Sequence, residues 1–392
     1  MPHFVAATTF VRYTRSTLLT GSLLHSPPRF RLASTMSIPS KMKACQIREQ
    51  GGLDVIQVTE VDVPQPAKGQ VLYEVQWAGV NFIDTYQRGG LYKLAMPYIL
   101  GNESAGVIIA LGEGVTEASH GFKIGDKVAA FTAGGAFAEY AVSLADKTVK
   151  IPESMSTKQA ATGLLQGLTA LTFIREAHPV RKGEHILVQA AAGGLGGLLV
   201  QLAKSAGAHV VGTISTEEKA KIARASGADH VILYGGQVDV VEEVYKITGG
   251  EGIDRGVHAV FDGVGKDTFE MDFDLVRRKG SIVSLTSKKR ELGARSPSVS
   301  CGNASGAVPP FSVLKLGPKN LKLIRPILNQ YVHTKHEFQT YSAELFGLLA
   351  SGQLRLSVHS EYPLSTEGIK QAQTDIMGRK SSGKLLIKVV QE

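Results

Sequence analysis

The spacing of apolar residues changes along the chain and predicts two kinds of structure. From Met42 to about residue 150, short apolar stretches such as "MKACQI", "VLYEVQWAGV" and "SAGVIIALGEGV" are separated by Gly and Pro turns. Short strands punctuated in this way are typical of an antiparallel barrel-like domain. From residue 156, "STKQAATGLLQGLTALTFIREA" has the period of a helix, with Ser156 or Thr157 as its cap.

After this helix, short apolar strands alternate with helical stretches. The expected strands are 185–190, 209–213, 230–233, 257–262 and 280–285. This alternation predicts a parallel, doubly wound sheet and therefore an α/β protein. The chain then continues with a predicted helix at 338–351 and the terminal strand "KLLIKVV".

With 392 residues, the chain is long enough for two domains. We expect a barrel-like domain from residues 42–163 and 326–392 and a nucleotide-binding domain from 164–325. Residues 286–300 interrupt the second domain with almost no apolar side chains, so this insert cannot build a core. It is either a surface loop or translated intron sequence.

The net charge of +8 is concentrated at the N-terminus, because residues 1–43 hold six basic residues and no acidic one. The remainder carries about two positive charges, so a broad phosphate-binding face is not expected and nucleic acid is an unlikely main partner. Residues 1–41 are rich in Arg and Ser, which is typical of a mitochondrial presequence. The alternative is a disordered extension before a second start at Met36 or Met42, which would leave the protein cytoplasmic.

Two classes of protein are excluded by composition. No run of ~18 apolar residues suggests a membrane span. The two cysteines, Cys45 and Cys301, lie far apart, which is incompatible with a disulfide framework or a multi-cysteine zinc site.

A glycine-rich turn follows the first predicted strand of the doubly wound sheet. The turn reads Ala191-Ala192-Gly193-Gly194-Leu195-Gly196, a GxGxxG pattern with Ala in the first place. Gly193 would let the backbone approach a pyrophosphate, and Gly196 would let the helix pack on the strand. The helix N-terminus supplies N–H donors, so we expect a dinucleotide site here.

The end of the next strand favours NADPH as the cofactor. A carboxylate at this place would bind the ribose 2′-hydroxyl of NAD, but the sequence has Ser215, followed by Lys219. Ser215 can donate a hydrogen bond to a 2′-phosphate, and Lys219 can add a positive charge. The alternative is that Lys219 is a solvated helix residue, and the neighbouring Glu217 and Glu218 favour that alternative.

Several motifs resemble one family over residues 42–392. They are "AGVNFIDTYQRGGLY", "GNESAGVI", "GDKVA", "LLQGLTAL", "AAAGGLGG", "GNASGAV" and "ELFGLLASGQL". The chain resembles the NADPH:quinone oxidoreductases of the zeta-crystallin type, which are medium-chain dehydrogenases/reductases. This resemblance implies a chaperonin-10-like antiparallel barrel domain joined to a Rossmann domain.

The same resemblance implies chemistry without a metal. The zinc-dependent members of the superfamily have a Cys where Asn81 stands and a His where Asn102 stands. Amide side chains cannot replace a thiolate and an imidazole as zinc ligands. We therefore expect no metal.

The resemblance also implies site residues around a cleft between the domains. Three residues are implied as catalytic: Asn81 near the nicotinamide, with Tyr86 and Tyr92 lining the acceptor pocket. Four further residues are implied to bind the cofactor: Thr169, Tyr234, Asn303 and Lys384. The structural alternatives are that the tyrosines are core or rim residues and that Asn81 is a turn residue.

Three functions remain open at this point. The first is NADPH-dependent reduction of quinones, and the second is NADPH-dependent reduction of 2-alkenals or other enones. The third is an NADPH-binding protein with an RNA-binding or structural role, although no basic-aromatic stripe lies outside the N-terminal extension. The apolar segment 320–326 resembles an edge strand that would pair two subunits, so we expect a homodimer.

Overall fold

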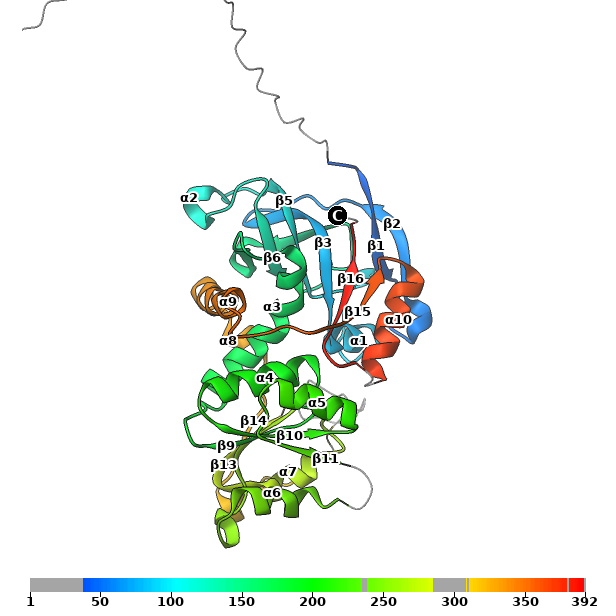
Figure 1. Ribbon diagram of the computed structural model, residues 1–392. Helices are drawn as coiled ribbons and strands as arrows, with labels where there is room; N and C mark the ends of the chain where they lie inside the picture. The colour runs from blue at the N-terminus through cyan, green and yellow to red at the C-terminus, as the bar shows by residue number, and fades with distance from the viewer. Residues whose placement is uncertain (1–37, 235–237, 285–307, 309, 379–380, 391–392) are drawn as a thin grey trace, which may run out of the picture. The chain divides into compact units, whose positions relative to one another are not determined.

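The computed structural model describes residues 38–234, 238–284, 308, 310–378 and 381–390 (Figure 1). The described residues from Pro39 onward belong to one compact unit. The predicted presequence lies almost wholly outside the described residues, because the description begins at Ile38. The insert at 286–300 and Asn303 lie outside them as well.

A seven-stranded sheet forms the predicted β domain. Along the sheet the strands are β15 (Val358–Pro363), β16 (Lys384–Lys388), β3 (Gln70–Val80), β5 (Glu103–Leu111), β6 (Lys127–Phe131) and β8 (Thr148–Lys150), with β7 (Tyr140–Leu144) also on β3. All its pairs are antiparallel except β15 with β16, which are parallel. The antiparallel prediction is therefore confirmed except at this edge, where α10 connects the two strands.

A smaller antiparallel sheet packs with this domain. Its strands are β2 (Gln57–Asp62), β1 (Lys41–Ile47) and β4 (Tyr98–Ile99). The backbone of Cys45 donates to the carbonyl of Phe137 at 2.8 Å, and Ala44 forms a bridge with Ala138. These bonds tie the small sheet to the chain just before β7.

The second large sheet is the predicted doubly wound one. Its strand order is β11 (His230–Leu233), β10 (His209–Ile214), β9 (His185–Val188), β12 (Val257–Asp262), β13 (Val276–Ser284) and β14 (Lys322–Ile324). Every pair is parallel. The chain reverses its direction of travel across the sheet between β9 and β12, which is where such folds bind ligands.

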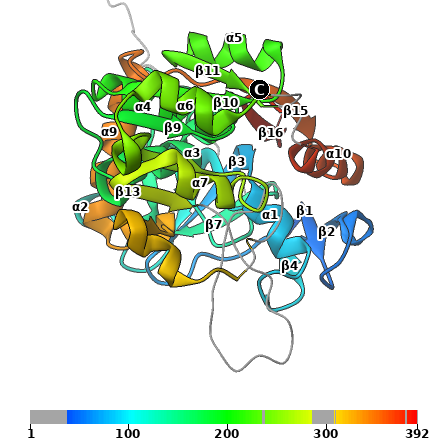
Figure 2. The same cartoon turned by 90° about the horizontal axis from the view of Figure 1, so that it is seen from below.

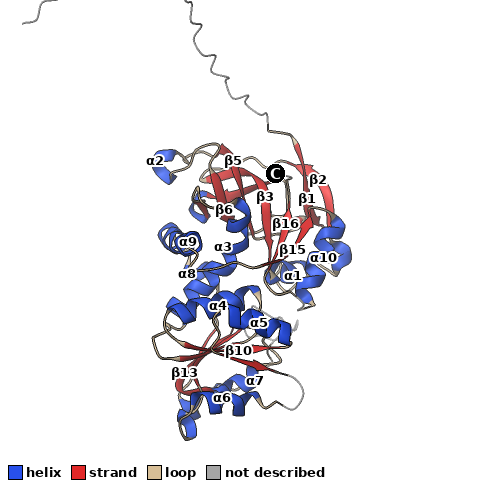
Figure 3. Ribbon diagram, viewed as in Figure 1, coloured by secondary structure: helices blue, strands red, loops and turns tan. Residues whose placement is uncertain are grey.

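Helices cover both faces of this parallel sheet, as the α/β prediction requires (Figures 1 and 3). They are α4 (Gly194–Ser205) and α5 (Glu217–Ala225) on one face, and α6 (Val240–Thr248) and α7 (Phe269–Leu275) on the other. The predicted strands are all present, although β9 ends at Val188 and β13 begins at Val276.

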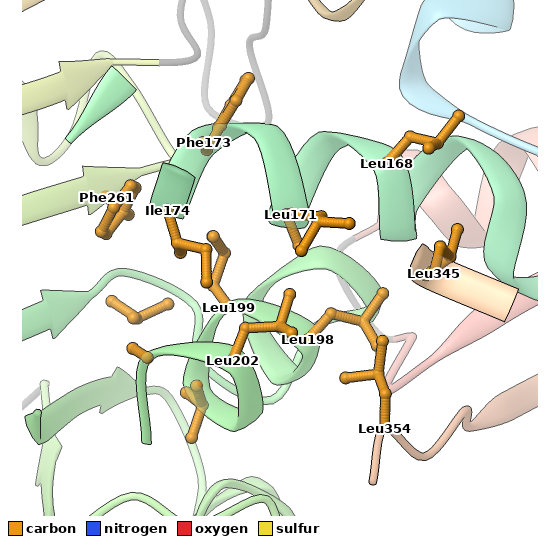
Figure 4. Close-up of a cluster of buried hydrophobic side chains, with 14 of the residues drawn as sticks. Leu168, Leu171, Phe173, Ile174, Leu198, Leu199, Leu202, Phe261, Leu345 and Leu354 are labelled. Carbon is orange, nitrogen blue, oxygen red and sulfur yellow. The ribbon is translucent and has the colours of Figure 1, made fainter. Parts of the chain in front are cut away.

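One long helix packs between the seven-stranded sheet and α4 of the other domain. Helix α3 (Thr157–Thr172) begins at Ser156, whose hydroxyl accepts from the backbone of Gln159 at 3.2 Å. It contacts β3, β5 and β6 on one side and α4 on the other. In Figure 4, Leu171 and Ile174 lie against Leu198, Leu199 and Leu202 of α4. The predicted domain boundary at 163/164 therefore falls inside a helix that joins one continuous core, and the boundary itself stays a prediction.

The remaining helices cover the β domain and its connections. They are α1 (Phe82–Arg88), α2 (Glu117–His120), α8 (Leu328–Tyr331), α9 (Lys335–Ala350) and α10 (Thr366–Met377). The predicted helix at 338–351 corresponds to α9. Helix α10 was not expected from the sequence, and it packs on β15, β16 and α1 (Figure 2). None of the helices in the described part of the chain is both long and apolar enough to cross a membrane.

Candidate active site

The glycine-rich turn lies between β9 and α4, as predicted. Its bend begins at Ala190, which has a left-handed backbone with φ of +54°. The N–H of Gly193 donates to the Ala190 carbonyl at 2.9 Å, and α4 begins at Gly194. A Cβ on Gly196 would lie 2.3 Å from the same carbonyl oxygen. Only glycine therefore allows α4 to approach the turn this closely, which is the role that the motif predicted for Gly196.

The other members of the motif differ in exposure. Ala192 is buried, whereas Gly193, Gly194 and Leu195 are partly exposed. A Cβ on Gly193 would lie 3.3 Å from the Ala190 oxygen, so its position is less crowded than that of Gly196. The start of α4 thus offers backbone N–H groups in the conformation that binds a pyrophosphate.

Three predicted cofactor residues meet at the carboxyl edge of β10 and β11. Ile214 pairs with Leu233, and the N–H of Tyr234 donates to the Ile214 carbonyl at 3.0 Å. Ser215 and Tyr234 are therefore neighbours, and both are exposed. Lys219 lies in the first turn of α5, and partial burial lowers the pKa of its ammonium. The described residues here can surround a 2′-phosphate, and no carboxylate stands at position 215.

The predicted contact of Thr169 with the cofactor stays a prediction. It is buried on α3, and its hydroxyl donates to the carbonyl of Leu165 in its own helix at 2.7 Å. The α3 residue beside the glycine turn is Gln166, because a Cβ on Gly194 would lie 2.5 Å from its amide oxygen. Sequence reasoning quoted Gln166 within "LLQGLTAL" but did not select it.

A buried polar network occupies the position that the zinc ligands hold in other members of the superfamily. Asn81 stands at the N-terminus of α1, and its amide nitrogen donates to Glu103 at 2.8 Å and to the Gly79 carbonyl at 3.2 Å. Its amide oxygen accepts from the Lys384 ammonium at 2.8 Å. Lys384 also forms an ion pair with Glu103, and the two side chains are 1% and 0% exposed. The second Glu103 oxygen accepts from the backbone of Leu165 at 2.7 Å.

The network continues through a second buried carboxyl group. One oxygen of Asp84 accepts from the backbone of Asn81 at 2.8 Å, and the other accepts from the amide of Asn102 at 2.6 Å. Asn102 also exchanges hydrogen bonds with Gln87. Burial raises the pKa of Asp84 to about 7, and its hydrogen bonds and the charge of Lys384 oppose that rise.

Both asparagines that replace zinc ligands are therefore committed to protein partners. Among the residues that the structure describes, no group of three or more His, Cys, Asp or Glu side chains could hold a metal ion. The ammonium of Lys384 is held by Glu103 and Asn81, so its predicted contact with the cofactor stays a prediction. Sequence reasoning missed Glu103, although a charged residue beside the apolar run in "GNESAGVI" was a usable signal.

The two candidate tyrosines lie on α1 and on the loop that follows it. Tyr86 is half-buried and stacks on Phe82, with ring centroids 6.2 Å apart. Tyr92 is also half-buried, and its carbonyl accepts from Gln50 at 2.6 Å. Because Asn81 caps the same helix, α1 and its loop bring all three candidate catalytic residues together. Their catalytic roles stay predictions.

Comparison with known proteins agrees with this architecture. Residues 67–153 match the alcohol dehydrogenase GroES-like domain, and residues 194–346 match the zinc-binding dehydrogenase domain. The second match reflects the superfamily and not the ligands, since Asn81 and Asn102 stand at the metal positions. The predicted fold class, a chaperonin-10-like domain with a Rossmann domain, is confirmed.

Three of the curated relatives that match most of the chain are reductases. A probable quinone oxidoreductase of Schizosaccharomyces pombe is 37% identical over 342 residues, which is 87% of this chain and 95% of the relative. Quinone oxidoreductase 1 of Escherichia coli is 35% identical over 87% of this chain and 98% of its own length. A 2-haloacrylate reductase of a Burkholderia species is 34% identical over 88% of this chain and 98% of its own length.

Solved structures agree with the curated relatives. A mycobacterial protein complexed with NADPH matches with a TM-score of 0.80 and 35% identity over 88% of this chain and 100% of that one. The Escherichia coli quinone oxidoreductase complexed with NADPH matches with a TM-score of 0.79 and 34% identity over 88% of this chain and 99% of that one. Amide side chains replace the zinc ligands, and both the fold and the sequence match quinone oxidoreductases. The chain therefore belongs to the zinc-independent quinone oxidoreductase family of the medium-chain dehydrogenases/reductases.

Proposed function

We propose that this protein is an NADPH:quinone oxidoreductase that works without a metal. The observation that carries the proposal is the carboxyl edge of the parallel sheet, where the glycine turn and Ser215 with Lys219 lie on neighbouring elements. The names of its relatives and the NADPH in two matching structures support the same cofactor and acceptor.

The chain's own residues would divide the work of binding and orientation. When bound, NADPH supplies the hydride that reduces the acceptor. The start of α4 would bind the pyrophosphate, and Ser215 and Lys219 would hold the 2′-phosphate. Tyr86 and Tyr92 would donate hydrogen bonds to the acceptor oxygen on which negative charge develops. No Lewis acid is needed to polarise a quinone, because it is already electron-poor.

Cofactor choice gives the first test. Lys219→Ala should raise the KM for NADPH and leave that for NADH nearly unchanged, because only NADPH carries the phosphate. The loss of one charged hydrogen bond corresponds to ~1.5–3 kcal/mol. Lys221→Ala, on the same helix, is the matched control and should change neither KM. Equal losses for both cofactors in Lys219→Ala would contradict the assignment.

Reduction of an enone is the second candidate, favoured by the similarity to a 2-haloacrylate reductase. An enone needs its carbonyl polarised while hydride reaches the β-carbon, so a positioned hydroxyl matters more than for a quinone. If the protein is a quinone reductase, Tyr86→Phe and Tyr92→Phe should keep most quinone turnover. If it is an enone reductase, one of them should lower kcat with an alkenal by ~10²-fold. Turnover of one ortho-quinone and one alkenal at saturating NADPH distinguishes the two.

A homodimer is part of the proposal. Strand β14 pairs with β13 and is the last strand on its side of the parallel sheet, with Leu323 and Ile324 half-buried. An edge strand of this kind can pair with its symmetry mate in a second copy. Sedimentation at micromolar concentration should give a dimer, and a monomer would contradict the pairing.

Mitochondrial targeting is also proposed, from the Arg-rich, acid-free segment 1–41. The full chain should be imported by isolated mitochondria and shortened on import. A chain that begins at Met42 should stay outside. Import of neither chain would favour the cytoplasmic alternative.

A further inference from the structure

Two buried aspartates meet directly behind the glycine turn. Asp262 is the last residue of β12 and Asp272 lies on α7, and both side chains are 0% exposed. The two carboxyl groups are within hydrogen-bonding reach of each other. Two carboxylates so close in a dry interior cannot both be ionised without a large electrostatic cost.

The hydrogen bonds around the pair show where a proton can sit. Oδ1 of Asp262 accepts from the backbone of Val264 at 2.8 Å, from the backbone of Gly265 at 3.1 Å and from the Thr268 hydroxyl at 2.9 Å. Oδ1 of Asp272 accepts from the amide of Gln189 at 3.1 Å. Oδ2 of each aspartate has no hydrogen-bond partner among the described residues. A proton shared by the two carboxyl groups would give these buried oxygens a partner.

The two aspartates differ in which form their surroundings favour. Three donors to Asp262 stabilise its anion, whereas Asp272 receives one. Burial raises the pKa of both carboxyl groups, and the charge of Asp262 raises that of Asp272 further. These surroundings favour the anion on Asp262 and the proton on Asp272.

Other charged groups near α7 have different partners. They are Lys315 with Glu270, Arg277 and Arg278 with Asp254, Lys246 with Glu243, and Arg255 with Glu242. The Lys319 ammonium binds backbone carbonyls at the end of α7, and Lys266, Asp267 and Asp274 are exposed. Among the described residues, Asp262 is therefore the charged group that raises the pKa of Asp272.

The pair is connected to the cofactor turn through one side chain. Gln189 accepts from the Thr213 hydroxyl at 2.5 Å and donates to Asp272, so its amide is fixed from β10 and from α7. Gln189 directly precedes Ala190, whose left-handed backbone is strained for a residue with a Cβ. Such a conformation persists only where its surroundings hold it. The Ala190 carbonyl in turn receives the N–H of Gly193.

We propose that the buried Asp262–Asp272 pair, joined by one shared proton, is a positioning element for the NADPH site. It fixes Gln189, and through Gln189 the turn at Ala190–Gly196, and it holds the loop of Val264 and Gly265 closed on β12. The inference rests on the proposed cofactor but not on the proposed acceptor. Asp272 is a positioning residue, because it acts through Gln189.

The shared proton is tested on the full chain by infrared spectroscopy. The measurement is made in an Asp84→Asn background, because Asp84, with a pKa of about 7, would add a protonated carboxyl band of its own at neutral pH. In this background the chain should show a protonated carboxyl band that shifts in D₂O. Adding Asp272→Asn should remove the band, since Asn can donate to Asp262 and accept from Gln189 without a proton. Adding Asp274→Asn instead, at an exposed carboxylate on the same helix, is the matched control and should keep it. A band that survives Asp272→Asn, or no band in the background variant, would overturn the proposal.

The positioning role is tested by NADPH and NADH binding without any acceptor, so its failure is separate from a failure of the quinone assignment. Asp272→Asn should bind both cofactors within about threefold of the wild type, and Asp272→Ala should weaken both by about tenfold or more. Equal losses of affinity for NADPH and NADH would place the defect in the glycine turn. Loss of Lys219, in contrast, should affect only NADPH, because only NADPH carries the 2′-phosphate. Unchanged binding in Asp272→Ala would overturn the positioning role.

If Asp272→Ala does not fold, the pH dependence of Asp272→Asn decides. Wild-type affinity for both cofactors should fall at the pH at which the infrared band disappears, because two buried carboxylates then repel each other. Asp272→Asn should keep its affinity through the same pH range. An equal fall in wild type and Asp272→Asn would overturn the proposal.

Discussion

Two buried polar clusters in this protein meet the cost of burying charge in different ways. In the seven-stranded sheet, Glu103 is paired with the Lys384 ammonium and with Asn81. Behind the glycine turn, Asp262 faces Asp272, and no cation reaches either of them among the described residues. A buried carboxylate needs a counter-charge or a proton, so the first cluster is built on an ion pair and the second on a shared proton.

The difference matters for what each cluster can do. The ion pair between β5 and β16 holds α1, α3 and the sheet in one arrangement. A shared proton can leave as the pH rises, and the groups that it joins then repel each other. The Glu103–Lys384 pair is a fixed support for its part of the fold, whereas the aspartate pair couples protonation to the cofactor turn.

The largest expected effect comes from breaking the ion pair. Lys384→Met leaves Glu103 buried without its counter-charge and should lower the free energy of unfolding by about 3–5 kcal/mol. Urea unfolding measures this. The double variant Lys384→Met with Glu103→Leu should recover most of the loss, because it removes both charges.

The matched control is a pair at the surface. Arg175 and Glu344 form an ion pair with side chains 57% and 35% exposed. Arg175→Met should change the free energy of unfolding by at most about 1 kcal/mol. An equal effect at the two sites would mean that the buried pair is no more important than an exposed one.

The next effect is a pH dependence of stability in the first cluster. The folded pKa of Asp84 is about 7, above its ordinary value of 3.8, so the folded state holds a proton that the unfolded state releases. Stability from Asp84 is therefore fully present below pH ~4 and is lost as the pH rises to about 7, by at most about 4 kcal/mol. The free energy of unfolding should fall less steeply over this range in Asp84→Asn.

The aspartate pair should add to the same slope, since burial raises both of its pKa values. Asp272→Asn removes part of that contribution. Because the two clusters share no partner, the changes in slope from Asp84→Asn and Asp272→Asn should add in the double variant. If the free energy of unfolding of the double variant depends on pH as steeply as that of one single variant, the two clusters are coupled.

A smaller effect is expected at the glycine turn. Gly196→Ala places a Cβ against the Ala190 carbonyl and should weaken NADPH binding by about 1–3 kcal/mol, the usual cost of overpacking. Gly197→Ala is the control, because its Cβ would meet its nearest atom at 3.5 Å. Titration of NADPH without acceptor measures both. Equal binding by the two variants would mean that α4 can move away from the turn.

The smallest effect is expected from removing metals. Exhaustive chelation should leave quinone turnover unchanged, because Asn81 and Asn102 are tied to Glu103 and Asp84 and cannot act as zinc ligands. Elemental analysis should find no stoichiometric zinc. About one zinc per chain would overturn the argument from the two asparagines.

Local sequence patterns predicted much of the fold. The strands of the parallel sheet, most strands of the seven-stranded sheet, the cap of α3 at Ser156 and the glycine turn follow from the spacing of apolar residues and from Gly positions within a few residues of one another. Strands β8 and β15 were not predicted. Ser215 and Lys219 could be placed at one end of the sheet because the carboxyl ends of parallel strands meet at one edge. The role of Gly196 could be predicted as well, because it depends only on the turn and on the helix that follows it.

The partners of the buried charges could not be found in this way. Lys384 is 281 residues from Glu103, and the two meet because β16 and β5 both pair with β3. The parallel pairing of β15 with β16 and the packing of α10 on both are equally non-local. Within the site, Thr169 lies on the predicted helix, but its hydroxyl bonds within that helix and Gln166 is the residue beside the turn.

The sequence by itself determined the class of fold and the dinucleotide turn, because each depends on residue types at short spacing. The loss of the zinc ligands followed from the resemblance of its motifs to a known family. Tertiary structure alone decided which buried carboxylate received a lysine and which received a second carboxylate. Sheet register and helix packing bring those groups together, and burial then makes their charge costly. Asp262 and Asp272 are only ten residues apart, yet only the packing of α7 on β12 turns two ordinary aspartates into a pair that needs one proton.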